Sequence, residues 1–330
     1  MKEVILGIET SCDDTAVALV DAGGNILSSM VASQLDVHAE FGGIYPEFAA
    51  RAHITAILPT LHKAFAVAGM GPHDICAIGV TRGPGLIGSL LVGLHTAIGL
   101  GLGWHKPVIG INHLRGHLRS ADLEEQRVKY PAVVLLVSGG HTLLAYMKNP
   151  MEIELLGSTL DDSVGECYDK VGRMLGLGYP GGPVVDRLAT KGVPSIPFPR
   201  PAINKGLEFS FSGLKSAVAR YLDAHPQALH EDVAASYVQA VMDVLMKKSE
   251  RALKRYPAQS FVMVGGVAAS PQLRQEAQTL CDKLNVALCL PPLHWSTDNA
   301  AMVALAAFDY LHLSIIKRPV AELQLKITDF

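Results

Sequence analysis

Apolar runs and short polar loops alternate along the first part of the chain. Residues 3–9 form a continuous apolar run, which a polar loop, TSCDD, separates from a second apolar run at residues 15–21. Continuous apolar strands that alternate with helical periodicity are typical of an α/β fold with a buried sheet. The other elements expected in this part are a helix at residues 54–68 and strands at residues 75–81 and 107–112.

The second part of the chain opens with the same layout of apolar strand, small polar loop and apolar strand. Residues 132–147, AVVLLVSGGHTLLAYM, follow a charged segment at residues 122–131 that we interpret as the junction between two lobes. The repeated hairpin predicts an internally duplicated fold, although two unrelated hairpins would give the same pattern. Helices are expected at residues 161–175, 209–222 (capped by Ser212), 231–254 and 297–313 (capped near Thr297), and a strand, glycine turn and helix at residues 260–274.

Length and composition favour two packed lobes with large buried surfaces. The chain has 330 residues, of which 49% are hydrophobic and only 18% are charged. A net charge of −3 excludes a broad basic surface, so any contact with nucleic acid has to be local or shared with a partner. The 5 cysteines are scattered without C-x-x-C spacing, which indicates reduced thiols rather than a disulfide framework or a zinc knuckle.

One segment, residues 86–104, is nearly free of charge and long enough to span a bilayer. It contains several glycines and His95, and no other part of the sequence resembles a span. We therefore expect a helix buried between a sheet and another layer, and no membrane contact. Since the N-terminus runs into a strand without the pattern of a signal peptide, the expected location is the cytoplasm.

Three loops rich in small residues follow apolar strands, at residues 10–14, 138–142 and 265–270. At strand ends of α/β proteins, the backbone N–H groups of such loops can approach a phosphate because no Cβ intervenes. A single glycine turn is more often simple geometry, but three in one chain favour a nucleotide site. The sequence has no P-loop motif, and no G-x-G-x-x-G follows the first strand.

Acidic residues gather on the helix expected at residues 161–175 and shortly after it. Asp162, Glu166, Asp169 and Arg173 form one polar stripe, whose simplest interpretation is a solvated face. The turn YPGGPVVD that follows would hold Asp186 rigidly, which suits a carboxylate that accepts hydrogen bonds from ribose hydroxyls.

His113 and His117 are four residues apart, which on a helix puts both imidazoles on one face. They could bind a metal or could be two surface histidines. Leu114 stands where a zinc peptidase with an H-E-x-x-H motif has its glutamate, so proteolysis is disfavoured. The best distant third ligand is Asp298, although alone it would more often be an ordinary N-terminal helix acid. Two histidines and one carboxylate suit iron or zinc.

Together these motifs closely resemble the TsaD family, the tRNA N6-adenosine threonylcarbamoyltransferases once described as O-sialoglycoprotein endopeptidases or glycoproteases. That family belongs to the actin/Hsp70/sugar-kinase (ASKHA) superfamily. The resemblance implies a duplicated actin-like (ribonuclease H-like) fold with a nucleotide cleft between two lobes, residues 1–128 and 129–330, the last helices from about residue 298 returning to the first lobe. In family order the resembling segments are GIETSCDDTAVAL, GGIYPEFAARAH, TRGPGLIGSLLVG, INHLRGH, LLVSGGHT, LDDSVGECYDKVGRMLGLGYPGGPVVD, FPRP, FSFSGLKSAV, MVGGVAAS and STDNAAM.

The activity implied by the resemblance is transfer of a threonylcarbamoyl group from threonylcarbamoyl-AMP to N6 of adenosine 37, with release of AMP, in tRNAs that read codons beginning with A. His113, His117 and Asp298 would hold one divalent ion, iron or zinc, and Mg²⁺ would accompany an ATP- or AMP-type nucleotide. In bacteria the implied partners, besides tRNA, are a smaller paralogue (TsaB) and a P-loop ATPase (TsaE). A kinase or ATPase of the same superfamily, or a metallopeptidase, are the alternative functions.

The resemblance also assigns binding residues, and the sequence departs from the family at some positions. The loops would hold the phosphate, Asp169 and Asp186 the ribose, and Asp13 is our candidate for the general base. Ser270 replaces the usual Asn, Ser296 the usual Cys, Asp14 the usual Glu, and Arg115 the Glu that is common in bacteria. The residues expected to bind substrate or nucleotide are Thr10, Ser11, Leu136, Val137, Ser138, Gly139, Gly140, His141, Asp169, Gly182, Asp186, Gly265, Gly266 and Ser270.

Overall fold

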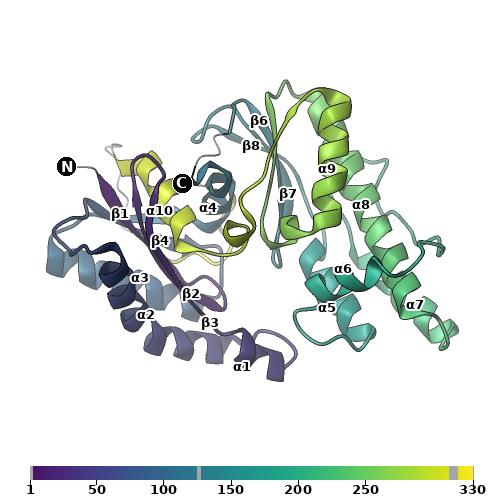
Figure 1. The fold of residues 1–330 in the computed structure, drawn as a ribbon, viewed down its shortest axis with the longest axis horizontal. Coiled ribbons are helices and arrows are strands. Elements are labelled where there is room, and N and C mark those ends of the chain that lie inside the picture. Colours follow the sequence, from purple (N-terminus) through teal and green to yellow (C-terminus); the bar gives the residue numbers. More distant parts are fainter. Residues whose placement is uncertain (1–2, 125–127, 312–318, 330) are drawn as a thin grey trace. The chain divides into compact units, whose positions relative to one another are not determined.

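The two hairpins expected from the sequence each begin a five-stranded sheet. The computed structural model describes residues 3–124, 128–311 and 319–329, and it divides into two compact units (Figure 1). Unit 1 comprises Met1–Arg127 and Pro291–Phe330, and unit 2 comprises Val128–Leu290. The residues after Pro291 therefore group with the first sheet and not with residues 128–290.

The sheet of unit 1 has the strand order β3-β2-β1-β4-β5. The first three strands form an antiparallel meander, and the last two continue the sheet in parallel to β1. The central strand β1 is buried along its whole length. The strands are β1 (Val4–Glu9), β2 (Asp14–Asp21), β3 (Ile26–Ser33), β4 (Ala77–Gly83) and β5 (Val108–Asn112).

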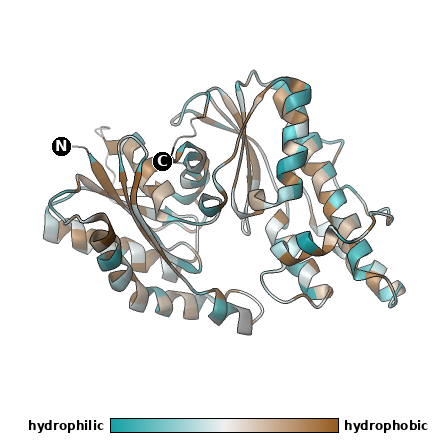
Figure 2. Cartoon of the chain, in the orientation of Figure 1, coloured by the Kyte–Doolittle hydropathy of each residue, from teal (hydrophilic) through white to brown (hydrophobic). Residues whose placement is uncertain are grey.

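The sheet of unit 2 repeats this arrangement. Its order, β10-β9-β6-β7-β8, is the same one read in reverse, with an antiparallel β6-β7-β8 meander and parallel β9 and β10. The duplicated α/β fold of ribonuclease H-like, actin-like type is confirmed. The strands are β6 (Ala132–Val137), β7 (Thr142–Met147), β8 (Ile153–Ser158), β9 (Ser260–Val264) and β10 (Ala287–Cys289). Figure 2 shows that apolar residues concentrate on the strands of both sheets.

Helices cover both faces of the first sheet. α2 and α3 pack on one face and α10 on the other (Figure 1). α2 begins at Pro46, earlier than the expected residue 54, since proline is preorganised for the first turn of a helix. α10 begins at Ala300 and not at residue 297, because the Asn299 side chain accepts the Met302 N–H at 2.9 Å and caps it. The helices are α1 (Leu35–Glu40), α2 (Pro46–Ala68), α3 (Ile87–Trp104), α4 (His113–Arg119) and α10 (Ala300–Leu311).

α3 is the one helix in the described part of the chain that is long and apolar enough to cross a membrane, a test that core helices also pass. Leu90 and Leu94 on one side of it are buried, and the helix packs against α2 and β4. Leu91 and Leu102 on the other side are exposed. The helix therefore covers the sheet, but the second layer expected over it is not formed by the described residues.

In unit 2, α8 and α9 lie side by side, and α8 packs on β6 (Figure 1). The expected cap of α7 is wrong: Ser212 is the first residue of the helix, and the Asp161 carboxylate accepts the N–H groups of Phe211 and Ser212 at 2.8 and 3.2 Å. The helices are α5 (Val164–Met174), α6 (Gly181–Ala189), α7 (Ser212–Ala224), α8 (His230–Arg255) and α9 (Pro271–Leu284).

Candidate active site

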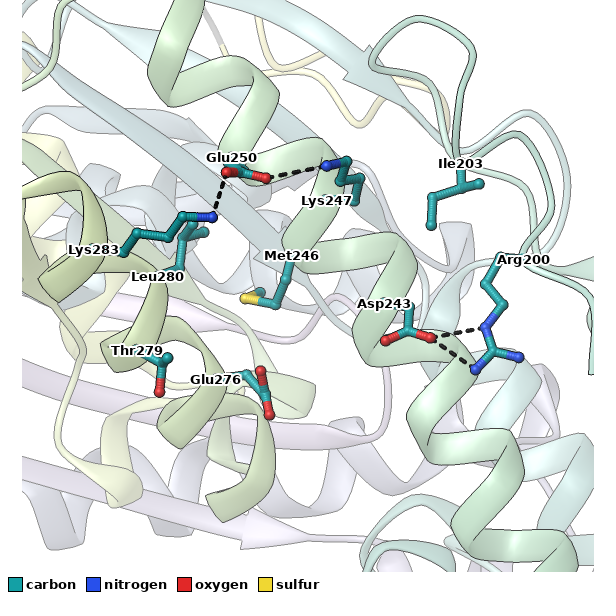
Figure 3. Close-up of a pocket in the computed structure, with 10 residues that line it drawn as sticks. All are labelled: Arg200, Ile203, Asp243, Met246, Lys247, Glu250, Glu276, Thr279, Leu280 and Lys283. Carbon is teal, nitrogen blue, oxygen red and sulfur yellow. Dashed lines mark hydrogen bonds and ion pairs between the residues drawn. The ribbon is translucent and has the colours of Figure 1, made fainter. Parts of the chain in front are cut away.

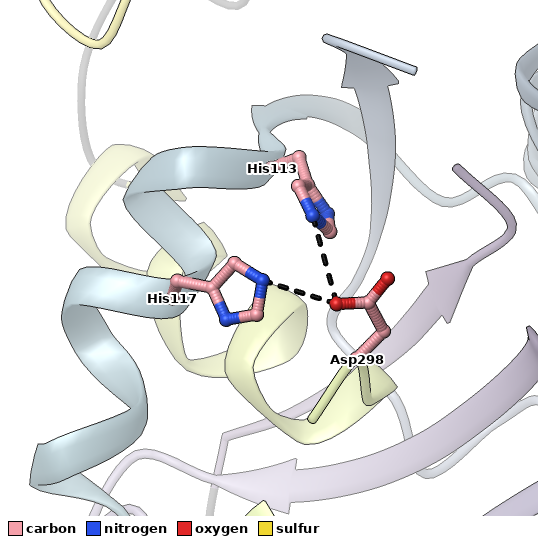
Figure 4. Close-up of side chains that lie close together, drawn as sticks. All are labelled: His113, His117 and Asp298. Carbon is pink, nitrogen blue, oxygen red and sulfur yellow. Dashed lines mark ion pairs between the residues drawn. The ribbon is translucent and has the colours of Figure 1, made fainter. Parts of the chain in front are cut away.

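His113, His117 and Asp298 converge in unit 1 (Figure 4). β5 ends at Asn112, whose side chain accepts the Leu114 N–H and caps α4, so that helix starts directly at His113. Both histidines point from α4 toward Asp298, which precedes α10. The Oδ1 atom of Asp298 lies 3.0 Å from Nε2 of His117 and 3.7 Å from Nε2 of His113.

Close helix packing brings these three residues together. A Cβ at Gly7 of β1 would lie 2.1 Å from the Ala300 carbonyl oxygen, so α10 lies directly on the strand backbone. Gly116 of α4 faces Met302 of α10, where a Cβ would lie 3.3 Å from the Met302 Cγ. The glycine between the two histidines therefore lets α4 approach the helix that Asp298 precedes.

The donor set fits a divalent metal ion. One ligand atom from each of the three side chains lies within 4.8 Å of the other two. His117 is fully buried; its Nε2 lies 3.0 Å from Oδ1 of Asp298, and its Nδ1 has no hydrogen-bond partner among the described residues. Burying a polar group without a partner costs free energy of folding. An imidazole nitrogen with a free lone pair can instead bind a metal ion. The Asp298 side chain is 26% exposed, which leaves the group accessible from one side.

Glu9, which was not predicted from the sequence, contacts His113 at its Nδ1 atom. Its Oε2 lies 3.0 Å from Nδ1 of His113 and accepts the Thr81 hydroxyl at 2.6 Å, while the Ser11 hydroxyl lies 3.2 Å from the same ring nitrogen. A carboxylate at Nδ1 favours the tautomer with its proton there, which leaves the Nε2 lone pair facing Asp298. The signal in the sequence was a lone acid ending an otherwise apolar strand.

The charges of these residues are strongly coupled. Burial opposes the positive charge of His113, but the carboxylates of Glu9 and Asp298 outweigh it and raise the pKa of His113 to about 9. Burial alone would raise the pKa of Glu9, yet the positive charge of His113 holds this pKa below its ordinary value. A divalent cation would have to displace the proton of His113, so metal binding and proton release are linked.

The first polar loop lies beside this group. Thr10 is buried and donates to the Ser89 carbonyl at 2.9 Å, so its hydroxyl supports α3. Ser11 contacts His113 as described above. Burial and the negative charge of Asp298 raise the pKa of Asp13, and burial raises the pKa of Asp14 to about 6.

In unit 2 the two predicted nucleotide turns meet through their backbones. Gly265 has a φ of 94°, and a Cβ there would lie 2.4 Å from the Val137 carbonyl oxygen. The turn after β6 is closed by Ser138, whose N–H donates to the His141 carbonyl at 2.8 Å and whose hydroxyl accepts the His141 N–H at 3.1 Å. A Cβ at Gly139 or Gly140 would meet nothing within 4 Å, whereas the side chains of Leu136 and Val137 are buried.

Asp169 and Gly182, both predicted to bind nucleotide, lie together. Oδ1 of Asp169 accepts the N–H groups of Gly181 and Gly182 at 2.8 and 3.3 Å, so this carboxylate caps the N-terminus of α6. Burial raises the pKa of Asp169 against the effect of these two hydrogen bonds. The polar stripe expected on α5 is therefore not uniformly solvated.

Asp186 and Ser270 form a second pair. The Ser270 hydroxyl and the Tyr168 hydroxyl donate to the buried Asp186 carboxylate, whose pKa is raised by burial and lowered by these bonds. Ser270 also accepts the Leu273 N–H at 3.3 Å and caps α9. The residue that departs from the family pattern is thus tied to a predicted ribose ligand.

A pocket of about 570 Å³ in unit 2 contains none of the predicted residues (Figure 3). It lies between α8, α9 and the segment that carries Arg200. Five of its charged side chains form ion pairs within the pocket: Glu250 with Lys247 and Lys283, and Asp243 with Arg200.

Comparisons with known proteins agree on one family. The TsaD family, described as tRNA N6-adenosine threonylcarbamoyltransferase, matches residues 25–305. Proteins of that name are 47% identical in Carboxydothermus hydrogenoformans, over 93% of this chain and 92% of that protein, and 47% identical in Bacillus subtilis, over 92% and 89%.

Solved structures of more distant proteins share the fold. Component A of the (R)-2-hydroxyglutaryl-CoA dehydratase of Acidaminococcus fermentans aligns with a TM-score of 0.56 at 16% identity, over 94% of this chain and 99% of that chain. HypF of T. kodakarensis aligns with a TM-score of 0.66 at 12% identity, over 94% of this chain and 48% of that chain. At these identities the likeness concerns the fold alone.

Proposed function

The chain belongs to the TsaD family of tRNA N6-adenosine threonylcarbamoyltransferases, and from this premise we propose how its residues carry out the transfer. It is a transferase that forms N6-threonylcarbamoyladenosine in tRNA. The observation that carries this conclusion is the 47% identity to relatives of that name over more than nine-tenths of the chain. We propose that the donor is threonylcarbamoyl-AMP and the acceptor adenosine 37 of tRNAs that read codons beginning with A.

In this reaction N6 of the adenine attacks the carbonyl carbon of the threonylcarbamoyl group. The C–O bond to the phosphate breaks, AMP leaves, and N6 loses a proton. Because the donor is a mixed anhydride, it is already activated, and the main tasks of the protein are orientation and stabilisation of charge on the carbonyl oxygen.

We propose that His113, His117 and Asp298 bind one divalent ion, iron or zinc. When bound, the ion supplies a Lewis acid or template for the threonylcarbamoyl group. The buried His117 ring, whose Nε2 lies 3.0 Å from Oδ1 of Asp298, and the Glu9 carboxylate at Nδ1 of His113 support this assignment. Asp13 is the proposed general base, since its raised pKa makes the carboxylate a better proton acceptor near neutral pH.

The turns of unit 2 are the proposed binding site for the adenylate. The backbone of residues 138–141 and 265–266 would contact the phosphate, and Asp169 and Asp186 the ribose. Thr10 and Ser11 of unit 1 are proposed separately as substrate contacts. The open space at Gly139 and Gly140 supports close approach of a ligand to this backbone. Mg²⁺ would accompany an ATP-type nucleotide at these turns.

Partners are expected because a net charge of −3 argues against a broad basic surface for tRNA. We propose a cytoplasmic assembly with the smaller paralogue TsaB and the P-loop ATPase TsaE. Exposed apolar side chains on α2 and α3, and on Tyr45 directly before α2, support a protein contact: Tyr45, Phe48, Ile54, Leu58, Val67, Ile87, Leu91 and Leu102.

The test combines metal analysis with nucleoside analysis. The purified chain, with threonylcarbamoyl-AMP, tRNA and the two partner proteins, is expected to produce N6-threonylcarbamoyladenosine at position 37. His113→Ala and Asp298→Ala should lose both bound metal and product, whereas the control His95→Ala, an exposed histidine on α3, should lose neither. Normal metal content and activity in the first two variants would exclude the metal role. Phosphotransfer to a small molecule without tRNA product would favour a kinase instead.

A further inference from the structure

Arg115 lies between the two histidines on α4, yet its side chain forms a hydrogen bond with Ile327, near the C-terminus of the chain. The side chain is buried, its Nε donates to the Ile327 carbonyl at 3.0 Å, and its Nη1 donates to the Tyr310 hydroxyl at 2.8 Å. Arg115 therefore joins α4 both to α10 and to residues 319–329, which we call the C-terminal strap.

The strap is fixed to unit 1 at further points. The Asn112 side chain donates to the Lys326 carbonyl at 2.7 Å, and the Glu322 N–H donates to the Arg82 carbonyl at 2.8 Å. The Glu322 carboxylate also pairs with the Arg82 guanidinium at 2.5 Å. The strap side chains of Leu325 and Ile327 are buried at 3% and 2% exposure. It is thus an integral part of the unit, although it contains neither helix nor strand.

α4 needs such support because it is very short. A helix of seven residues has little stability of its own, so its position depends on tertiary contacts. The residue before it, Asn112, uses one side-chain atom to cap the helix and the other to bind the strap. Since metal ligands must be held to within a fraction of an ångström, loss of these contacts would disturb His113 and His117 before the rest of the unit.

We propose that Arg115 is a positioning residue which, together with the C-terminal strap, holds α4 so that His113 and His117 face Asp298. This inference rests on the metal site proposed for those three residues. It accounts for an arginine between the two histidines, because a guanidinium can donate to the strap and to Tyr310 at once.

The test compares two arginines of the same helix. Arg115→Lys keeps a buried positive charge but loses the simultaneous contact with the Ile327 carbonyl and the Tyr310 hydroxyl, whereas the matched variant Arg119→Lys alters an arginine that pairs with Asp122 and Asp309. Zn²⁺ affinity is measured by competition with a chromophoric chelator, and amide exchange of residues 113–117 gives a second readout. Arg115→Lys should weaken Zn²⁺ binding about tenfold and accelerate exchange, as for other residues that support metal ligands. Arg119→Lys should change Zn²⁺ affinity by less than about threefold, because a lysine can keep the ion pairs that Arg119 makes with Asp122 and Asp309.

A chain ending at residue 318 provides the second arm. If Arg115 acts through the strap, this chain should show the same loss of Zn²⁺ affinity, and adding Arg115→Lys to it should cause little further loss. Fully additive losses, or equal losses for the two lysine variants, would overturn the proposal. Should the shortened chain fail to fold, the comparison of Arg115→Lys with Arg119→Lys still decides whether Arg115 positions α4. If the unaltered chain binds neither Zn²⁺ nor Fe²⁺, both the proposed metal site and this inference are wrong. If the unaltered chain binds Zn²⁺ and Arg115→Lys binds it with the same affinity, only the role of Arg115 is wrong.

Discussion

Nδ1 of His113 lies 3.0 Å from Oε2 of Glu9, so a buried carboxylate at the end of the first strand orients the first histidine of the proposed metal site. Both groups are almost completely removed from solvent, with side chains 8% and 1% exposed. In this environment the pair fixes the proton on Nδ1, and the Nε2 atom is left to face Asp298. Glu9 is therefore as much a part of the site as the ligands.

Replacing Glu9 by Gln should weaken metal binding without removing a ligand. Gln keeps an acceptor for Nδ1 but loses the charge, so we expect Zn²⁺ affinity to fall about tenfold. In the metal-free chain the pKa of His113 should fall from about 9, because Glu9 is the largest influence that raises it. Competition with a chelator and NMR titration of the imidazole measure the two effects. Glu47→Gln, on the exposed side of α2, is the control, and equal behaviour of the two variants would contradict the role of Glu9.

Gly7→Ala should displace α10 and with it Asp298. The added Cβ would lie 2.1 Å from the Ala300 carbonyl oxygen and 2.9 Å from the Ala304 nitrogen, both of them backbone atoms that cannot move alone. We expect a loss of about 1–3 kcal/mol in the free energy of unfolding, measured by urea denaturation, and weaker metal binding.

Gly116→Ala is the matched variant, because its Cβ would meet only the flexible Met302 side chain at 3.3 Å. Alanine also favours the helix by up to about 1 kcal/mol, so this variant should retain its stability. If Gly7→Ala were as stable as Gly116→Ala, the account of how α10 lies on β1 would be wrong.

Much of the fold, and the placement of the two histidines on one helix face, could be predicted from the sequence, because apolar runs and local motifs determine them. The buried strands beginning at Val4 and Ala132 are uninterrupted apolar runs, and the duplicated hairpin follows from them. His113 and His117 share a helix face by spacing alone. Asp298 was only the best distant candidate for a third ligand until the family resemblance assigned it too, since residues so distant in sequence have no local signal that joins them.

Contacts between residues that are distant in the sequence account for the features that the sequence did not predict. The cap of α7 comes from Asp161, some fifty residues upstream, so the local pattern pointed to Ser212 instead. Glu9 was read as the end of an apolar strand, and the partner of Arg115 lies 212 residues away at Ile327. In each case a polar side chain is satisfied by a group that only the tertiary structure brings near.

Asp14 should make stability depend on pH. Burial raises its pKa from 3.8 to about 6, and its Oδ1 is buried without a hydrogen-bond partner among the described residues. The folded state therefore binds the proton more tightly than the unfolded state. Stability contributed by the protonated group is present below pH 3.8 and is lost as the pH rises through 6, at a cost of up to about 3 kcal/mol above that pH.

Asp14→Asn should remove this cost, so the variant should be more stable than the unaltered chain at pH 8 and the difference should shrink toward pH 4. Urea denaturation at several pH values measures it. Asp36→Asn, in the exposed first turn of α1, should show no comparable trend between those pH values. A gain for Asp14→Asn that stayed constant with pH would contradict the titration of this carboxyl group.

The turns of unit 2 can be tested by adding a single methyl group at two glycines. Gly139→Ala places a Cβ in open space, so the free energy of unfolding should change by less than about 0.5 kcal/mol. If a phosphate approaches the backbone of this turn, the same methyl group should weaken AMP binding about tenfold, or by about 1.4 kcal/mol.

Gly265→Ala should lower both stability and affinity, because its φ is 94° and its Cβ would lie 2.4 Å from the Val137 oxygen. Calorimetric titration with AMP and urea denaturation separate the two effects. Gly99→Ala on α3, also in open space, is the control, and unchanged AMP affinity in Gly139→Ala would remove this turn from the nucleotide site.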